Sequence, residues 1–492
     1  MKNDNIKFKI IFFCAFFLSG FLAWGNAQAD THTAATCSYD NVNAAITSAE
    51  TGDTVSVPAG ECTWATYVNI PSAKKITLQG SGSSNTVITF STANAVRLNE
   101  SGSRITGIGF NQGSGTATQN ITTQGTGWRI DHCSFTNASA SSVTAIYIYG
   151  DNITYLPYGL IDNNTFNNGR IDINGMTNFS EAGDEWSANS VLGTANAVYI
   201  EDNTFYKHIS FTSNVIDANR GVSYVARYNS VSGDTGFMTH SIHSNNQRAT
   251  KNWETYGNSF TAEDSTYYGI DFRAGTGVIF GNYFSSGMTN PILFDNVRSY
   301  AYAGSGDCQP DDCSVVGFCD GSSYIDGNDS SNGWPCRDQI GRGKDISKWS
   351  VYTDTPTGQE SQPAYSWLNR KVSAIASPTI ANNCGAWIQA NRDYYTEGAS
   401  FNGTSGVGCG TLANRPSSCT AGVAYWATNQ SCSDLTGMVG VNPETPISGT
   451  LYKCTATDTW TEYYEPYTYP HPLRTEASDV IAPASPTGLA VT

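Results

Sequence analysis

The sequence predicts an all-β chain built as a solenoid, in which one strand-and-turn unit repeats along a single axis. Two observations predict this class. Apolar and polar residues alternate in short stretches such as Val198–Ile200, a pattern typical of strands rather than helices. A five-residue motif follows such stretches, with asparagine third and usually an aromatic residue fifth, at Asp162–Phe166, Glu201–Phe205, Arg227–Val231, Tyr256–Phe260 and Phe280–Phe284. An earlier copy, Asp131–Phe135, has cysteine in place of the asparagine.

The spacing of the motif predicts coils of constant circumference. The anchors Cys133, Asn164, Asn203, Asn229, Asn258 and Asn282 lie 31, 39, 26, 29 and 24 residues apart. The shortest spacing between anchors is near 24 residues, and the longer spacings indicate loops inserted into some coils. An inward asparagine in each coil can bond the backbone of its own turn and the asparagines above and below it. The aromatic residue two positions later would point the same way and stack on its neighbours.

The first 29 residues have the pattern of a secretory signal. Lys2, Lys7 and Lys9 precede the apolar run Ile10–Leu22, and Ala27–Ala29 is a small-x-small cleavage site. An uncleaved membrane anchor is the alternative, but the run is short for a membrane span. We therefore expect a secreted protein that has no membrane contact after cleavage.

Residues 30–300 are predicted to form the solenoid together with an N-terminal cap. Tyr39–Glu50 has one apolar face, made by Val42, Ala45, Ile46 and Ala49, and reads as a short helix that covers the open end of the first coil. Gly52–Gly60 is predicted to follow as a strand plus turn, and further strands are predicted in quick succession at Val68–Ile70, Ile76–Leu78, Val87–Phe90, Ala95–Leu98 and Ile105–Phe110.

The composition changes at about Tyr300, where the motif is expected to stop. Residues 301–480 are rich in cysteine and aromatic residues and are interpreted as a C-terminal cap or as excursions packed along the side of the solenoid. Residues 481–492 read as a linker that resembles the opening of a fibronectin type III domain.

Cysteine usage indicates an oxidising compartment. The chain has 13 cysteines, and Cys14 lies in the signal, so the rest are even in number, as expected of disulfides. Cys37 and Cys62 bracket the first unit and are predicted to pair. Cys133 stands alone at a ladder position, and its state is left open.

The formal net charge of −16 argues against a nucleic-acid partner. An acidic glycan remains compatible with it, provided that the binding groove is locally basic or holds a cation.

The cap, the strand-rich coils and the Asn-x-Phe motif together resemble right-handed parallel β-helix proteins of the pectate-lyase-like superfamily, over Cys37–Tyr300. The resemblance implies the fold: a right-handed parallel β-helix with an N-terminal helical cap and a Cys-rich C-terminal region. It does not imply one activity, because lyases, hydrolases, adhesins and surface proteins share this architecture.

A column of arginines is the candidate site. Arg220, Arg248 and Arg273 lie nine, ten and nine residues before their anchors, and equal offsets stack on adjacent coils about 4.8 Å apart. Asp217 and Asp271 run beside this column, and Tyr224 and Tyr268 are near it in sequence. His240, His243 and Lys251 come from or follow an inserted loop over the same region.

These residue types suit β-elimination from a uronate, which needs a cation at the carboxylate, a base for the C5 proton and an acid for the leaving oxygen. Arg220, Arg248 or Lys251 would neutralise the carboxylate or act as base. His240 or His243 is the more natural base near neutral pH, and a tyrosine would be the acid. The alternatives are a self-paired surface ladder, a non-catalytic adhesin or matrix protein, and a glycoside hydrolase with paired carboxylates.

Calcium is the one cofactor that the sequence suggests. Asp320, Asp326, Asn328 and Asp329 offer closely spaced oxygen ligands, although a solvated acidic turn is the better explanation of this pattern. The expected partner is an acidic polysaccharide or cell-surface glycan, which the protein binds and, as a polysaccharide lyase, cleaves.

Overall fold

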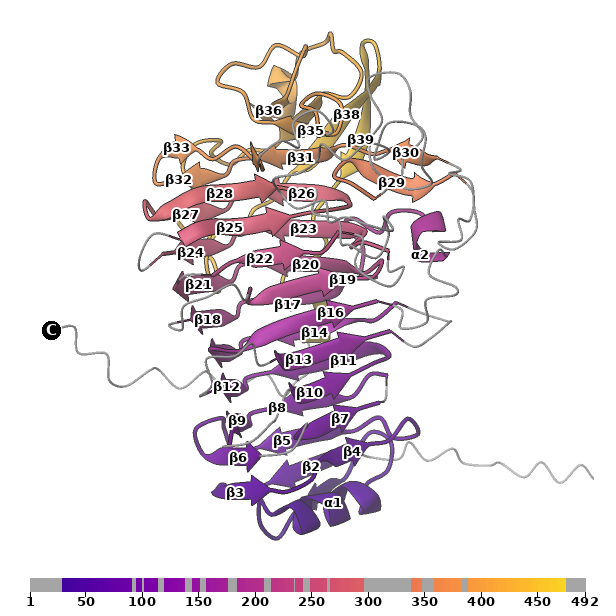
Figure 1. Cartoon of the computed structure of the whole chain (residues 1–492), viewed down its shortest axis with the longest axis vertical. Helices are drawn as coiled ribbons and strands as arrows, with labels where there is room; N and C mark the ends of the chain where they lie inside the picture. Colours follow the sequence, from indigo (N-terminus) through magenta and orange to yellow (C-terminus); the bar gives the residue numbers. More distant parts are fainter. Residues whose placement is uncertain are drawn as a thin grey trace, which may run out of the picture.

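A computed structural model of the 492-residue chain describes residues 29–90, 94–99, 101–113, 119–137, 144–150, 156–175, 184–207, 214–233, 235–241, 248–262, 266–295, 338–346, 358–381 and 388–474. These residues form a right-handed parallel β-helix (Figure 1). Three long sheets run along its axis, and successive strands of each sheet come from successive coils. The predicted fold class is confirmed.

Sheet A consists, in spatial order, of β1 (Thr31–Thr33), β2 (Thr54–Val57), β5 (Thr77–Gly80), β8 (Arg104–Thr106), β11 (Thr126–Asp131), β14 (Tyr158–Asp162), β17 (Val198–Glu201), β20 (Ser223–Arg227), β23 (Asn252–Tyr256), β26 (Thr276–Phe280), β31 (Ala364–Trp367) and β35 (Tyr394–Thr396).

Sheet B consists of β3 (Gly60–Trp64), β6 (Thr86–Phe90), β9 (Gly109–Gln112), β12 (Ser134–Thr136), β15 (Thr165–Asn167), β18 (Thr204–Lys207), β21 (Ser230–Gly233), β24 (Ser259–Thr261), β27 (Tyr283–Phe284), β32 (Arg370–Lys371) and the antiparallel β33 (Ala374–Ile375).

Sheet C consists of β4 (Val68–Ile70), β7 (Val96–Leu98), β10 (Gln119–Thr123), β13 (Thr144–Tyr149), β16 (Arg170–Asn174), β19 (Ile216–Asn219), β22 (Phe237–Thr239), β25 (Thr266–Phe272), β28 (Met288–Phe294) and β34 (Thr379–Ile380).

The predicted ladders lie between sheets A and B. Asn164 Nδ2 donates to Asn203 Oδ1 at 3.0 Å, and the same bond repeats from Asn203 through Asn229 and Asn258 to Asn282. Each amide also donates to a backbone carbonyl of its own or the preceding coil. The phenylalanines two positions later stack, with Phe166 and Phe205 ring centroids 4.6 Å apart. Repetition in sequence thus becomes repetition of buried hydrogen bonds and ring contacts.

Cys133 occupies the first rung of this ladder. Its backbone N–H donates to Asn164 Oδ1 at 2.9 Å, and its thiol is buried and free. Burial raises the pKa of this thiol far above its ordinary value, so it stays protonated. The predicted Cys37–Cys62 disulfide is present.

The N-terminal cap also follows the prediction. Helix α1 (Tyr39–Ser48) buries Val42, Ala45 and Ile46 against the first coil. The predicted strand Ile105–Phe110 is instead two strands, β8 and β9. Gly107 separates them with a φ of +67°, a left-handed turn that carries the chain from sheet A to sheet B.

The coils continue past the boundary expected near Tyr300. After residues 296–337, the chain adds β31, β32 and β34 to the three sheets, and Asn369 joins the ladder. Two elements lie beside this region, the short helix α2 (Asp184–Ser187) and the antiparallel pair β29 (Arg342–Asp345) and β30 (Gln359–Ser361) (Figure 1).

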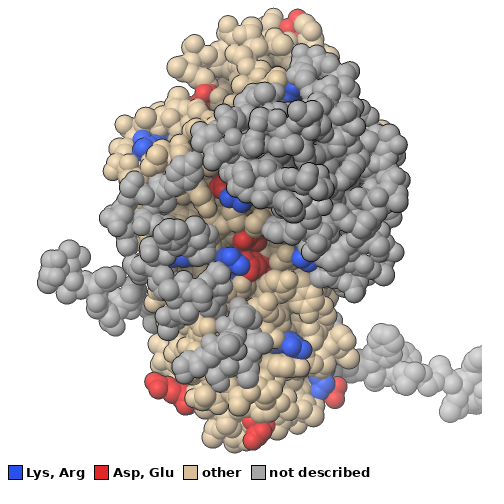
Figure 2. All heavy atoms as spheres, viewed as in Figure 1, with Lys and Arg blue, Asp and Glu red and all other residues tan. Residues whose placement is uncertain are grey.

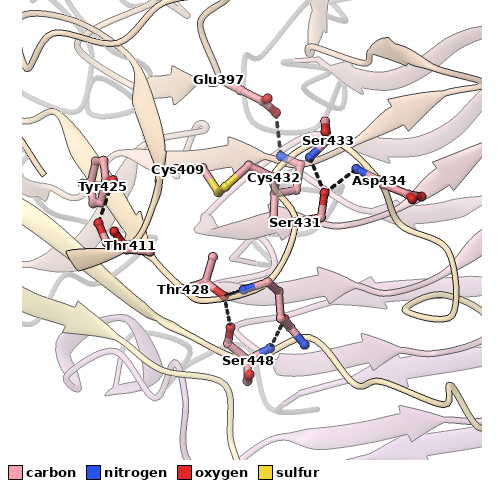
Figure 3. The surroundings of a disulfide bond; sticks show 12 residues. Glu397, Cys409, Thr411, Tyr425, Thr428, Ser431, Cys432, Ser433, Asp434 and Ser448 are labelled. Carbon is pink, nitrogen blue, oxygen red and sulfur yellow. Dashed lines mark hydrogen bonds between the residues drawn. A yellow bond between two sulfur atoms is a disulfide. The ribbon is translucent and has the colours of Figure 1, made fainter. Parts of the chain in front are cut away.

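A small sheet completes the C-terminal region: β36 (Val407–Gly410), β37 (Ala424–Ala427), β38 (Thr450–Ala456) and β39 (Thr459–Tyr464), with short 3₁₀ turns at Leu412–Asn414 and Pro472–Arg474. Disulfides Cys409–Cys432 and Cys419–Cys454 brace it. Figure 3 shows the first, beside the Ser431 hydroxyl that accepts the N–H groups of Ser433 and Asp434.

This region packs on the outer face of sheet A. Trp367 stacks on Phe280 with ring centroids 4.4 Å apart, and the fully buried Trp426 lies beside both rings. These aromatic residues therefore fill a second core rather than a sugar-binding surface.

Residues 465–474, which we call the strap, then run back along sheet A over a row of buried charges. Arg227 pairs with Glu201 at 2.6 Å and donates to the Tyr467 and Thr468 carbonyls. Arg474 pairs with Glu201 and Asp202. The C-terminal region and the strap therefore cover the outer face of sheet A around β17, β20, β23 and β26.

Candidate functional site

The outer face of sheet C carries a group of partly exposed charged residues near the centre of the solenoid. Figure 2 shows acidic and basic side chains gathered at mid-height of the face in view. Ile216 and Ala218 of β19 point into the core, so the alternate residues Asp217 and Asn219 point outward. In register, Asp172 of β16 pairs with Asp217, and Met238 of β22 pairs with both Asp217 and Asp271.

Arg170 joins the first two carboxylates. Its Nε lies 2.5 Å from Asp172 Oδ1, and its NH1 group lies 3.8 Å from Asp217 Oδ2. The Thr144 hydroxyl donates to the other Asp172 oxygen. Burial raises the pKa of Asp172, although Arg170 opposes the shift. Two acids on adjacent strands thus share one guanidinium.

His240 follows β22 and bonds the central acid. Its Nε2 lies 3.0 Å from Asp217 Oδ1, and its ring is partly exposed. A carboxylate at this distance holds an imidazole in one orientation.

Asp271 and Arg273, at the end of β25, form the next pair, with Arg273 NH2 2.8 Å from Asp271 Oδ2. Asp271 Oδ1 is buried and has no hydrogen-bond partner in the described part of the chain. Burial raises the pKa of Asp271 to about 6, against the charge of Arg273 and assisted by the nearby Asp295. This carboxyl therefore changes charge close to neutral pH.

Two further groups border the site. The Tyr268 hydroxyl donates to Asn214 Oδ1 at 2.7 Å, and burial raises its pKa so that it remains protonated. Lys207 ends β18 on sheet B, where the chain turns toward sheet C. Burial, and after it the charge of Arg170, lowers the pKa of Lys207 to about 8. The sequence analysis missed Lys207 because it lies four residues after an anchor, outside the arginine offset.

Arg220 stands at the turn after β19 with a φ of +59°. Its side chain is partly exposed and interacts electrostatically with Tyr147 of β13. The Arg220 carbonyl lies so close to Gly175 that a Cβ there would meet it at 1.8 Å. Gly175 therefore permits this turn to pack against the coil below.

The predicted arginine column is only partly formed. Arg220 and Arg273 both follow strands of sheet C, but His240 follows β22, the strand between them. Arg248 lies instead just before β23 of sheet A, where it is buried and pairs with Asp338 and Asp345 at 2.7 and 2.8 Å. The register Ser223–Asn252–Thr276 brings Ala249, not Arg248, level with Arg220 and Arg273, because the offset of Arg248 is ten rather than nine.

Two other candidates are buried away from this face. Lys251 Nζ donates to the Ala188 carbonyl at 2.6 Å, and Tyr224 lies inside the solenoid core. His243 and the acidic set Asp320, Asp326, Asn328 and Asp329 fall outside the described residues. The structure thus brings together Asp217, His240, Tyr268, Asp271 and Arg273, with Arg220 at their edge.

Within the described residues, no group of three or more His, Cys, Asp or Glu side chains is arranged to hold a metal ion. No helix among those residues is long and apolar enough to cross a membrane.

Solved structures with similar folds are polysaccharide lyases. A mannuronic acid specific polysaccharide family 6 lyase from human gut microbiota aligns at 18% identity and a TM-score of 0.38, over 54% of this chain and 66% of that one. An alginate lyase from Paenibacillus sp. str. FPU-7 aligns at 17% identity and 0.34, over 51% and 94%. A family 6 alginate lyase, solved as an arginine-to-alanine mutant, aligns at 13% and 0.35, over 75% and 52%.

No family model and no curated protein matches the chain. At these identities and TM-scores the likeness to the lyases concerns the fold alone. The three parallel sheets of the chain itself show that it is a right-handed parallel β-helix protein.

Proposed function

We propose that the outer face of sheet C binds an acidic, uronate-containing polysaccharide and cleaves it by β-elimination. The observation that supports this most directly is the Asp217–His240 pair, which is partly exposed and lies between the cations Arg170 and Arg273 on the outer face of the sheet. This grouping supplies the residue types that the reaction needs, on adjacent coils.

Each role follows from the chemistry of the side chain. Arg220, Arg273 and Lys207 would bind and neutralise the sugar carboxylate, which makes the neighbouring C5 proton more acidic. His240 would take that proton, and Asp217 would stabilise the imidazolium that forms. The pair of electrons left on C5 forms the C4–C5 double bond as the C4–O bond breaks. Tyr268, protonated at neutral pH, would donate a proton to the leaving oxygen.

A glycoside hydrolase is the second candidate, and one observation favours it. Asp172 and Asp217 lie opposite each other on adjacent strands, and burial raises the pKa of Asp172. An acid beside an ionised carboxylate is the arrangement that hydrolytic cleavage of a glycosidic bond uses. Hydrolysis produces reducing ends without the unsaturated sugar that β-elimination leaves.

The test is incubation of the purified protein with a panel of uronate polymers, with and without calcium, while ultraviolet absorbance and reducing ends are followed. A rise in absorbance on one polymer supports the lyase, and reducing ends without absorbance support the hydrolase. With the active polymer, His240→Ala should lower kcat at least 100-fold. Lys371→Ala, a cation removed from sheet B, is the matched control and should leave kcat unchanged. If neither signal rises on any polymer, catalysis is excluded and a binding or structural role remains.

We also propose that the protein is secreted. The three disulfides of the described residues are compatible with an oxidising compartment, and the signal pattern of residues 1–29 supports export. Mass spectrometry of the protein recovered from the medium or periplasm, with a new N-terminus near Asp30, tests this.

A further inference from the structure

Aromatic side chains occupy the outer face of sheet C one coil below the charged residues. Tyr147 and Tyr149 both belong to β13 and point outward between the core residues Ile146 and Ile148. Tyr147 is in register with Asp172, which is in register with Asp217. The two rings are partly exposed, tilted by 33°, with centroids 5.8 Å apart. They form one apolar surface beside the proposed reaction centre.

The row of outward residues that contains Tyr147 continues toward the N-terminal end of sheet C. Below Tyr147 come Thr122 of β10 and then Arg97 of β7, each in register with the next. The Arg97 guanidinium lies 3.8 Å from the centre of the Tyr67 ring and donates to its hydroxyl. Arg97 and Asp217 are four rungs apart, about 19 Å at roughly 4.8 Å per rung.

This row is unlike the other outward surfaces. The matching face of sheet A is covered by the C-terminal region, and the rows of sheet B carry mostly serine, threonine and asparagine. A surface that carries two tyrosine rings and, beyond the buried Thr122, an arginine suits a chain that has sugar rings to stack and carboxylates to pair. The charge of Arg220 acts on Tyr147, so Arg220 connects this surface to the charged site.

We infer that Tyr147 and Tyr149, with Arg220 and Arg97, form a platform that binds successive sugar residues of the uronate chain on the N-terminal side of the reaction centre. The polysaccharide then lies along the solenoid axis, because the rung spacing is comparable to the length of one sugar in an extended chain. This inference rests on the proposed function and adds to it a direction of binding and a set of positioning residues.

The experiment measures binding separately from cleavage, in the His240→Ala background, by calorimetry with the uronate polymer that gives the strongest response. Tyr147→Ala and Tyr149→Ala should each weaken polymer binding about tenfold, the loss of one ring contact. Tyr147→Phe should retain most of the affinity, since the ring remains. Tyr206→Ala removes an exposed tyrosine from sheet B and should leave binding unchanged.

Oligomer length supplies a second readout. An oligomer too short to reach from Asp217 to Tyr147 should bind the Tyr147→Ala variant as well as it binds the unsubstituted background. Equal polymer binding by the tyrosine variants and the background would overturn the platform and leave the proposed function intact. Absence of binding by the background and the wild-type protein to every uronate polymer would overturn both. Circular dichroism and the melting temperature verify that each variant is folded.

Discussion

The Asn282 amide donates to Asn369 Oδ1 at 2.9 Å, although the two residues are 87 positions apart in the chain. Asn369 Nδ2 in turn donates to the Ile279 carbonyl of the preceding coil. After a long excursion the chain therefore re-enters the ladder in the same register. The Asn282 amide is buried at the end of the stack and needs a hydrogen-bond partner, which the Asn369 side chain supplies.

Loss of a central ladder member should be severely destabilising. Asn229→Ala removes the acceptor of the Asn203 backbone and side-chain N–H groups and the donor to the Ile200 carbonyl. These groups would be left buried without partners, at about 1–3 kcal/mol each. We expect a fall of about 4 kcal/mol or more in the free energy of unfolding, measured in guanidinium chloride. Asn99→Ala, which loses one exposed amide bond, should cost less than about 1 kcal/mol.

Most of the fold was predictable because it repeats. Each coil between Asp131 and Phe284 contains the same motif, so a coil whose own copy is misassigned can still be recognised from its neighbours. Asn369 was missed because lysine stands two positions after it, and because 87 residues separate it from the previous anchor. Gly107 was placed within a strand although the alternation of apolar residues changes phase there, because Ile105 and Ile108 are three positions apart.

The site was less predictable because it depends on where inserted loops rejoin the coils. Asp217, Asp271 and Arg273 lie in or directly beside strands, and their offsets placed them correctly on one face. Arg248 has an offset one residue longer, and it is buried against Asp338 and Asp345, which lie about 90 residues later in the sequence. Lys207 lies on sheet B, so its distance in sequence from an anchor differs from that of the site residues on sheet C.

The buried Glu254 should make the protein more stable in mild acid. Burial raises its pKa to about 7, although Tyr464 and the Gly193 N–H donate to it. An unfolded glutamate ionises near its ordinary value of 4.5. Between these values the folded state binds the extra proton, so stability falls as the pH rises from about 4.5 to 7 and stays lower above.

The size of this effect is on the order of 3 kcal/mol. Unfolding free energies of wild type and Glu254→Gln, measured from pH 4.5 to 8.5, give the test. The wild type should lose stability relative to the variant across this window. If the difference in unfolding free energy between wild type and variant is the same at every pH, the pKa of Glu254 in the folded protein is close to its value in the unfolded chain.

The Arg227–Glu201 pair should hold the strap on sheet A. Both side chains are fully buried, and Arg227 also donates to two carbonyls of the strap. Arg227→Met removes one of the cations that pair with the buried Glu201. The free energy of unfolding should fall by about 3–5 kcal/mol. Hydrogen exchange should become faster in residues 465–474 while the Asn ladder stays protected. Arg97→Met, on the open face of sheet C, should cost less than about 1 kcal/mol and leave the strap protected.

The disulfides should stabilise the C-terminal sheet independently of the solenoid. Cys419 and Cys454 close a loop across 35 residues and tie the segment that precedes β37 to β38. Replacing both with serine should destabilise this region by about 3–4 kcal/mol. Limited proteolysis should then cut within residues 400–464 first. Cys133→Ala removes a free thiol from the ladder and should not promote those cuts.

Lys207 should make polysaccharide binding depend on pH near 8. Burial and the charge of Arg170 lower its pKa to about 8, so the ammonium that would pair with a sugar carboxylate is lost as the pH rises through this value. In the His240→Ala background, affinity for a uronate polymer should fall about fivefold between pH 7 and 9, the loss of one charge contact. Lys207→Met should abolish this dependence.

Arg170→Met supplies the decisive comparison. Removal of the neighbouring positive charge raises the pKa of Lys207, so the fall in affinity should move to higher pH rather than vanish. Lys371→Met, a cation lost from sheet B, should leave both midpoint and amplitude unchanged. A midpoint that stays near 8 in Arg170→Met, or persists in Lys207→Met, would assign the titration to another group and remove Lys207 from the site.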